Sequence, residues 1–271
     1  MTGRWVEVAD GVHARRYEEL DLTVGLVVGA DRCLVIDTRG DLDQGAELAA
    51  AVRQLTALPW AVAFTHAHFD HTWGTERFLP CAVWAHEGCR AELTEYAEGA
   101  REKWMAYYRE EGKAAIANAI ARTTFVVPDH LFSDRTELDL GGRTAVLLHP
   151  GRAHTDHDVI VHVPDAEVVF AGDIVENAEH GFSAFSFGAD SDLTAWPDTL
   201  DTLLALEPRV VVPGHGDPVD ADFVRYHRHG LHELIALKAA VGRGESTEAA
   251  AVAVAASRYP ADVTSAALKT L

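Results

Sequence analysis

Four short stretches of the sequence are rich in histidine and aspartate, side chains that commonly bind metal ions in enzymes. Each stretch follows a run of apolar residues, so each is expected at the end of a buried strand. The candidate metal ligands are His66, His68, Asp70, His71, His154, Asp173 and His215. Divalent metals bind neutral imidazoles and ionised carboxylates that converge from several directions, and dispersed clusters in a β-rich fold can supply them. The pattern therefore predicts a two-metal hydrolase.

The spacing within the first stretch has a physical reason. Residues 60–65 are apolar and β-prone, so the chain is expected to enter the stretch in an extended conformation. Alternate side chains of extended backbone share one face, which predicts that His66, His68 and Asp70 point the same way. His71 follows where the chain is expected to turn into a short helix. One loop could then supply two ligands to each of two ions roughly 3.5–4 Å apart.

The order of these motifs resembles that of the metallo-β-lactamase superfamily. The resemblance extends from about residue 12 to about residue 219, and it includes the strand at 34–38 that usually precedes the site. It implies an α/β (α+β) fold of the four-layer αββα type. In such a sandwich two sheets face each other, helices cover the outside, and the metal ligands lie on loops along one edge.

The resemblance also implies a role for each candidate ligand. The first metal ion would be bound by His66, His68 and His154, the second by Asp70, His71 and His215, and Asp173 would bridge both. Asp70 and Asp173 are also the candidate catalytic residues, because either could orient an attacking hydroxide. Asp37 is expected to fix the tautomer of a ligand imidazole.

The reaction implied by the resemblance is hydrolysis by a metal-bound hydroxide. Two cations that share a water lower its pKa far below the ~15.7 of bulk water. The substrate would be a thioester, ester, lactone or amide of a small molecule. Zinc is the expected metal because the ligands are histidine and carboxylate without thiolate, although iron or manganese fits the same set. β-Lactamases of this fold usually carry Cys or Ser at the bridging position, so Asp173 indicates the glyoxalase-II-like, thioesterase-like branch.

Two alternative functions remain open. An iron-dependent oxygenase or sulfur-oxidising enzyme of the same fold would generally use one metal ion, whereas both ligand sets are complete here. A non-catalytic binding module would be expected to have lost some ligands, and none is lost. The complete sets favour the hydrolase over both alternatives.

Composition narrows the class of partner. The chain has 271 residues, 48% of them hydrophobic, and its 23 Lys+Arg against 42 Asp+Glu give a net charge of −19. This acidity argues against a nucleic-acid partner, whose phosphates require a basic surface. No apolar run reaches membrane-spanning length, and the amino terminus has no apolar signal core. The three cysteines are sparse and lack metal-like spacing, which favours a reducing cytoplasm. Together these features predict a cytoplasmic enzyme that acts on small molecules.

Strands and helices alternate along the chain without repeats, which favours a single domain covering residues 1–271. The expected strands are 12–17, 23–29, 33–37, 61–65, 82–85, 136–140, 143–148, 158–163, 168–171 and 210–213. Helices are expected at 43–58 and 193–206, and the short helix after the first motif at 72–78. A helical tail is expected at about 221–271. Its last part, 246–271, is expected either to dock on the body or to serve as a dimer surface, so a homodimer is one interpretation.

A helical insertion is expected at about 87–123. It is long for a connection, so it could be a lid over the site or an ordinary helical hairpin that packs on the body. Its Trp104 and Tyr108 are four residues apart, where a helix places them on one face. Phe182 and Phe185 follow Asp173 in a loop rich in glycine and serine, and they could form an apolar pocket wall or part of the core. These four aromatic residues are the candidate substrate contacts.

Overall fold

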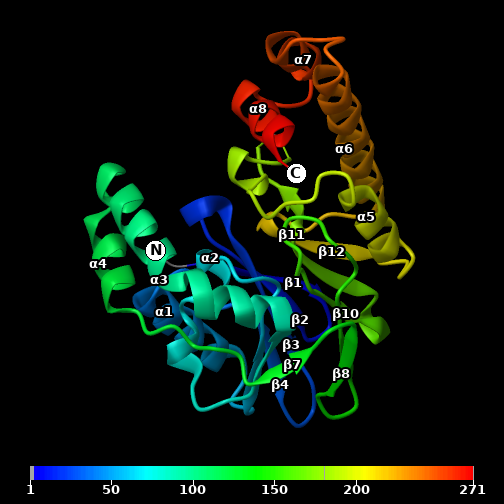
Figure 1. Ribbon diagram of the computed structural model, residues 1–271. Helices are drawn as coiled ribbons and strands as arrows, with labels where there is room; N and C mark the ends of the chain where they lie inside the picture. Colours follow the sequence, from blue (N-terminus) through cyan, green and yellow to red (C-terminus); the bar gives the residue numbers. More distant parts are fainter. Residues whose placement is uncertain (1–2, 180, 271) are drawn as a thin grey trace.

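The computed structural model describes residues 3–179 and 181–270 of the chain. These residues form two β-sheets that face each other, and eight α-helices lie on the outer faces of the sheets or at their edges (Figure 1). Helix, sheet, sheet and helix follow one another as layers, which confirms the predicted α/β fold. None of the described helices is both long and apolar enough to cross a membrane.

The first sheet contains seven strands in chain order. Its strands are β1 (Arg4–Ala9), β2 (Val12–Arg16), β3 (Thr23–Val28), β4 (Cys33–Ile36), β5 (Trp60–Ala63), β6 (Val83–His86) and β7 (His130–Phe132). Neighbours are antiparallel from β1 to β4 and parallel from β4 to β7. The two edge strands were not predicted, because β1 has no fully buried side chain and β7 has only three residues.

The second sheet contains five strands in the order β12-β11-β10-β9-β8. Its strands are β8 (Arg135–Asp139), β9 (Thr144–Leu148), β10 (Ile160–Val163), β11 (Val168–Asn177) and β12 (Val210–Gly216). Only β11 and β12 are parallel to each other. Both are longer than the sequence predicts, and their added residues include the candidate ligands Asp173 and His215.

The helices divide between the two outer faces. They are α1 (Leu42–Leu55), α2 (Phe69–Thr72), α3 (Glu87–Glu110), α4 (Ala114–Arg122), α5 (Trp196–Leu204), α6 (Ala221–Gly242), α7 (Glu248–Ala255) and α8 (Ala261–Lys269). Figure 1 shows α1, α3 and α4 on the side of the first sheet and α5 to α8 on the side of the second. Helix α1 is capped by the preceding Asp41, whose side chain accepts hydrogen bonds from the backbone N–H groups of Asp43 and Gln44.

Three clusters of buried side chains hold these layers together. The central cluster lies between the sheets and joins residues such as Leu34 and Ile36 to Val161 and Phe170. A second cluster lies between the first sheet and helices α1, α3 and α4. A third lies between the second sheet and helices α5, α6 and α8, where Val263 and Ala267 are among the buried residues. The carboxy-terminal tail therefore docks on the body through α8.

Candidate metal site

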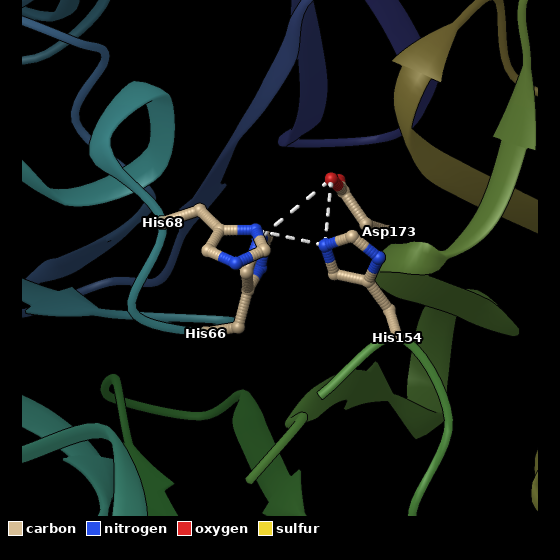
Figure 2. Close-up of side chains that lie close together, drawn as sticks. All are labelled: His66, His68, His154 and Asp173. Carbon is tan, nitrogen blue, oxygen red and sulfur yellow. Dashed lines mark hydrogen bonds and ion pairs between the residues drawn. The ribbon is translucent and has the colours of Figure 1, made fainter. Parts of the chain in front are cut away.

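Seven side chains, all of them candidate ligands from the sequence, converge where strands of both sheets end. They form two groups, of which the first is His66, His68, His154 and Asp173, and the second is Asp70, His71 and His215. Within each group one donor atom per residue lies within 4.8 Å of the others. Figure 2 shows the first group, in which His66 and His68 approach from one side and His154 and Asp173 from the other. The structure therefore brings together all seven predicted residues.

The first motif changes direction earlier than its spacing predicts. Strand β5 ends at Ala63, and His66 and His68 lie on the loop that follows. Asp70 and His71 lie in α2, which begins at Phe69 and therefore before the predicted helix at 72–78. The prediction that Asp70 shares a face with His66 and His68 is wrong, because alternation ends where the helix begins. Asp70 lies in the group that contains His71 and His215, the group that the resemblance implies for it.

Two glycines allow the second sheet to present its carboxylate. A β-carbon built at Gly214 would lie 1.9 Å from Oδ1 of Asp173, so the neighbouring strand leaves no room for any other residue there. Gly172 has φ +54, and a β-carbon at that position would lie 2.7 Å from Cβ of Thr65. The irregular pairing of β11 with β12 at this point lets Asp173 reach both groups of possible ligands.

Asp173 lies between the two groups. Its Oδ1 is 3.2 Å from Nε2 of His71, and its Oδ2 is 3.2 Å from Nε2 of His215. The same Oδ2 is 3.5 Å from Nε2 of His154 and 3.7 Å from Nε2 of His66. This carboxylate therefore contacts imidazoles of both groups.

The chemistry of the donor atoms fits a cation. Nε2 of His66, Nε2 of His71 and Oδ1 of Asp173 are buried and have no hydrogen-bond partner among the described residues. Burying an unpartnered polar atom costs about 1–3 kcal/mol, so three such atoms side by side require an explanation. Imidazole nitrogens and carboxylate oxygens are ligands that divalent metals accept, and a bound ion would satisfy all three.

The other ring nitrogen of each histidine is held by a neighbouring group. The contacts are His66 Nδ1 with Thr65 Oγ1 at 3.1 Å, His68 Nε2 with Asp190 Oδ2 at 3.5 Å, His71 Nδ1 with Asp37 Oδ2 at 2.8 Å, His154 Nδ1 with the Ser186 carbonyl at 2.9 Å, and His215 Nδ1 with the Leu20 carbonyl at 2.7 Å. In His71, His154 and His215, Nδ1–H donates to these oxygens, so Nε2 is the nitrogen directed toward the other candidate ligands. Nε2 of His154 lies 2.8 Å from Nδ1 of His68. The predicted contact of Asp37 with a ligand imidazole is confirmed.

Asp190 was not identified from the sequence. It lies in the loop before α5, far along the chain from His68, and no motif or spacing connects the two residues. Burial raises the pKa of Asp190, but the hydrogen bond and charge of His68 outweigh this effect and lower the pKa to about 2. Asp190 is therefore ionised near neutral pH and stabilises one orientation of the His68 ring.

Electrostatics separate the histidines into two kinds. Burial lowers the pKa of His154 to about 4, although the charge of Asp173 opposes this shift. Burial also lowers the pKa of His215, but the charge and hydrogen bond of Asp173 outweigh it and raise the value to about 10. In the metal-free protein His154 is thus neutral and ready to bind a cation. His215 must first release a proton, so metal binding at its group is coupled to pH.

The candidate substrate contacts have different environments. Phe182 is 1% exposed and Tyr108 is 0% exposed, so neither lines an open surface and their prediction as substrate contacts is wrong. Both are core rings, Phe182 beneath the loop that carries it and Tyr108 beside Phe69. Phe185, in contrast, is 59% exposed, and Trp104 is half-buried and stacked on Phe69.

Comparison with known proteins agrees with this geometry. A sequence model of the metallo-beta-lactamase superfamily matches residues 19–215, a span that includes all seven candidate ligands. A type 2 metallo-beta-lactamase of Bacteroides fragilis is 29% identical over 140 residues, which cover 48% of this chain. The chain spans about half, 55%, of the length of that relative. The probable metallo-hydrolase YqgX of Bacillus subtilis is 26% identical over 196 residues, 72% of this chain and 84% of that protein.

A solved structure extends the comparison to the fold. A metallo-beta-lactamase from Pontibacter korlensis superposes with a TM-score of 0.64, over 85% of this chain and 99% of that one. Its sequence is 20% identical, so this likeness concerns the fold alone. The match of the superfamily model covers more than half of the chain and ends at the last candidate ligand. The chain therefore belongs to the metallo-beta-lactamase superfamily.

Proposed function

We propose that the chain, a metal-dependent hydrolase, binds two divalent metal ions and cleaves a thioester, ester, lactone or amide of a small molecule. The position of Asp173 carries this proposal. Its two oxygens lie 3.2 Å from Nε2 of His71 and 3.2 Å from Nε2 of His215, and it also contacts the first group of donors. A carboxylate shared by two sets of imidazoles supports a site in which two ions act together.

The proposed ligand sets follow the two groups of side chains. The first ion would be held by His66, His68 and His154, the second by Asp70, His71 and His215, and Asp173 would bridge them. When bound, such ions lower the pKa of a shared water and polarise a carbonyl oxygen. Zinc is the proposed metal, since the set combines histidine and carboxylate without thiolate, and iron and manganese are the competitors to compare with it.

The protein itself would contribute position and proton transfer. The Leu20 and Ser186 carbonyls and the Asp37 carboxylate hold Nδ1 of three imidazoles, which fixes the orientation of each ring. Asp70 is 8% exposed, and its Oδ2 lies 3.5 Å from Nε2 of His215. Asp70 and Asp173 are therefore the residues proposed to orient the attacking water and to accept its proton.

The bridging residue supports a choice of substrate. The name of the Bacteroides fragilis relative refers to β-lactams, which makes β-lactam cleavage one candidate activity. At the bridging position, however, this chain has a carboxylate in contact with both groups of donors. We therefore propose hydrolysis of thioesters or related acyl esters in preference to β-lactams.

Metal analysis combined with a substrate screen tests the proposal. The purified chain would be reconstituted with zinc, iron or manganese, and each form would be assayed on thioesters, lactones, β-lactams and phosphodiesters. The proposal expects close to two ions per chain and the highest kcat/KM on a thioester or acyl ester. At most one ion per chain would exclude the two-metal arrangement, and a strong preference for a β-lactam would exclude the substrate class.

A cytoplasmic location completes the proposal. The three cysteines Cys33, Cys81 and Cys89 are free thiols, and two of them are buried. Unpaired thiols are typical of a reducing compartment, and the net charge of −19 supports a small-molecule substrate over a nucleic acid. Fractionation of cells that produce the protein would test the location.

A further inference from the structure

Aromatic side chains from two distant parts of the chain meet beside the candidate metal site. Phe185 lies in a short 3-10 helix, Ala184–Ser186, and Trp104 lies on α3. Their ring centroids are 6.1 Å apart, and Phe185 is also 6.1 Å from Tyr107, which lies 5.4 Å from Trp104. We call Trp104, Tyr107 and Phe185 the aromatic clamp.

Both sides of the aromatic clamp lie next to residues that neighbour or contact candidate metal ligands. Trp104 stacks on Phe69 with ring centroids 4.0 Å apart, and Phe69 stands between His68 and Asp70 in the sequence. Phe185 directly precedes Ser186, whose carbonyl accepts the hydrogen bond from Nδ1 of His154. The aromatic clamp therefore adjoins the site from the side of each sheet.

Phe185 is held outside the core by its own loop. Its backbone N–H donates to Oγ of Ser183 at 3.1 Å, and the N–H of Ser183 donates to Oγ of Ser186 at 2.9 Å. These bonds fix the short helix, yet Phe185 remains 59% exposed while Phe182 of the same loop is buried. A large exposed ring gains free energy when an apolar partner covers it, and the site next to it is where such a partner would react.

The charges near the site favour an uncharged partner. Two divalent ions would carry four positive charges, and four carboxylates belong to the site or contact its imidazoles: Asp37, Asp70, Asp173 and Asp190. With two ions bound, these four carboxylates would offset the metal charge. Among basic residues near the aromatic clamp, Lys113 is paired with Glu19 at 3.0 Å, and Lys103 lies over the Trp104 ring.

We infer that the aromatic clamp binds the apolar acyl chain of an uncharged ester, thioester or lactone and makes the enzyme prefer longer acyl chains. The inference rests on the proposed function, because an acyl chain reaches the aromatic clamp only when its carbonyl lies at the two groups of donors. Trp104, Tyr107 and Phe185 are thus specificity-determining residues. They contact the part of the substrate beside the bond that is cleaved.

The test compares uncharged p-nitrophenyl esters with acetyl, butyryl and octanoyl groups on the zinc-loaded enzyme. Burial of several methylene groups predicts a kcat/KM at least about tenfold higher for octanoyl than for acetyl. Phe185→Ala should reduce the octanoyl-to-acetyl ratio about tenfold, chiefly through KM, and Phe185→Leu should restore part of it. Tyr226→Ala is the matched control, because Tyr226 is an aromatic residue of similar exposure, 56%, on α6.

Each outcome bears on a different statement. An unchanged octanoyl-to-acetyl ratio in Phe185→Ala, with the esters still hydrolysed, overturns the aromatic clamp and leaves the proposed function intact. Failure of the zinc-loaded enzyme to hydrolyse any ester, thioester, lactone or amide overturns both. A succinyl ester with a free carboxylate that exceeds the butyryl ester in kcat/KM overturns the preference for an uncharged substrate.

Discussion

The carboxylate of Asp37 accepts a hydrogen bond from Nδ1 of His71 over 2.8 Å, which ties the end of β4 in the first sheet to helix α2. The same carboxylate accepts hydrogen bonds from the backbone N–H and the hydroxyl of Thr65 at 2.8 and 2.7 Å. One buried aspartate therefore fixes both the loop that enters the first motif and an imidazole within it. Burial lowers the pKa of His71, but the charges of Asp173, Asp70 and Asp37 raise it well above its usual value.

Asp37→Asn should weaken metal binding at the second group. The amide lacks the charge that makes the His71 ring a stronger donor, so the affinity for the second ion should fall about 10–100-fold. Competition with a chromophoric zinc chelator measures this affinity. Asp129→Asn is the control, because Asp129 forms a similar contact with His130 at 2.9 Å on the surface. Equal zinc affinities in both variants would contradict the role of Asp37.

His215→Ala should reduce the metal content from about two ions per chain to about one. The variant removes an Nε2 donor from the second group and leaves the four residues of the first group in place. Turnover should fall by orders of magnitude, while the far-ultraviolet circular dichroism stays unchanged. His229→Ala is the control, because the His229 side chain is 68% exposed on α6 and lies outside both groups. Two ions per chain in His215→Ala would refute the assignment.

His227 should make the protein sensitive to acid. Burial lowers the pKa of His227 to about 3, and Arg258 adds to this shift. Its folded-state pKa lies below the 6.5 of the unfolded chain, so the stability is present above pH 6.5 and is lost as pH falls toward 3. In that window the free energy of unfolding should fall by about 1.4 kcal/mol per pH unit because of this group.

The variant His227→Phe isolates that contribution. Phenylalanine keeps a ring next to Phe182, whose centroid is 3.7 Å from that of His227, and it removes a buried nitrogen without a hydrogen-bond partner among the described residues. Urea unfolding of both metal-free proteins between pH 7 and pH 4 gives the comparison. The stability difference between variant and wild type should grow as pH falls. A constant difference would show that His227 does not titrate in this window.

Gly214→Ala should weaken metal binding, whereas Gly99→Ala should stabilise the folded protein. A β-carbon at 214 would meet the Asp173 carboxylate at 1.9 Å, so alanine should displace that side chain and weaken metal binding at both groups. A β-carbon at Gly99, in the exposed part of α3, would have no neighbour within 4 Å. Alanine there should stabilise the protein by about 0.5–1 kcal/mol, because glycine loses more backbone entropy in a helix. Thermal unfolding and metal analysis of both variants check this contrast.

The candidate ligands could be predicted because each follows a run of apolar residues. Strands such as β4, β5 and β11 are buried on both faces, and their unbroken apolar runs are visible in the sequence. The polar residues that follow them must leave the core at the same edge of the sandwich. The residue at which the chain turns into α2 was harder to predict, because Phe69 is compatible with a strand as well as with a helix. The predicted orientation of Asp70 was wrong for that reason.

Contacts between loops that are distant in the chain could not be predicted from the sequence. Asp190 approaches His68, and Ser186 approaches His154, only because the loop after β11 folds back across the site. The loop also lacks a regular period, so the sequence does not reveal that Phe182 faces the core while Phe185 faces solvent. Tyr108 is a related case, because its position on α3 could be predicted but its burial in the core could not.

The packing of Phe182 has a consequence for the carboxy-terminal tail. The superfamily match ends at residue 215, yet His227 and Tyr259 beyond it pack against Phe182, in the loop whose Ser186 carbonyl holds His154. An ion that orders His154 would therefore also stabilise α6 and the segment just before α8, which contains Tyr259. Thermodynamic linkage makes this effect reciprocal. Zinc should slow amide hydrogen exchange in α6, and cleavage within the tail should in turn weaken zinc binding.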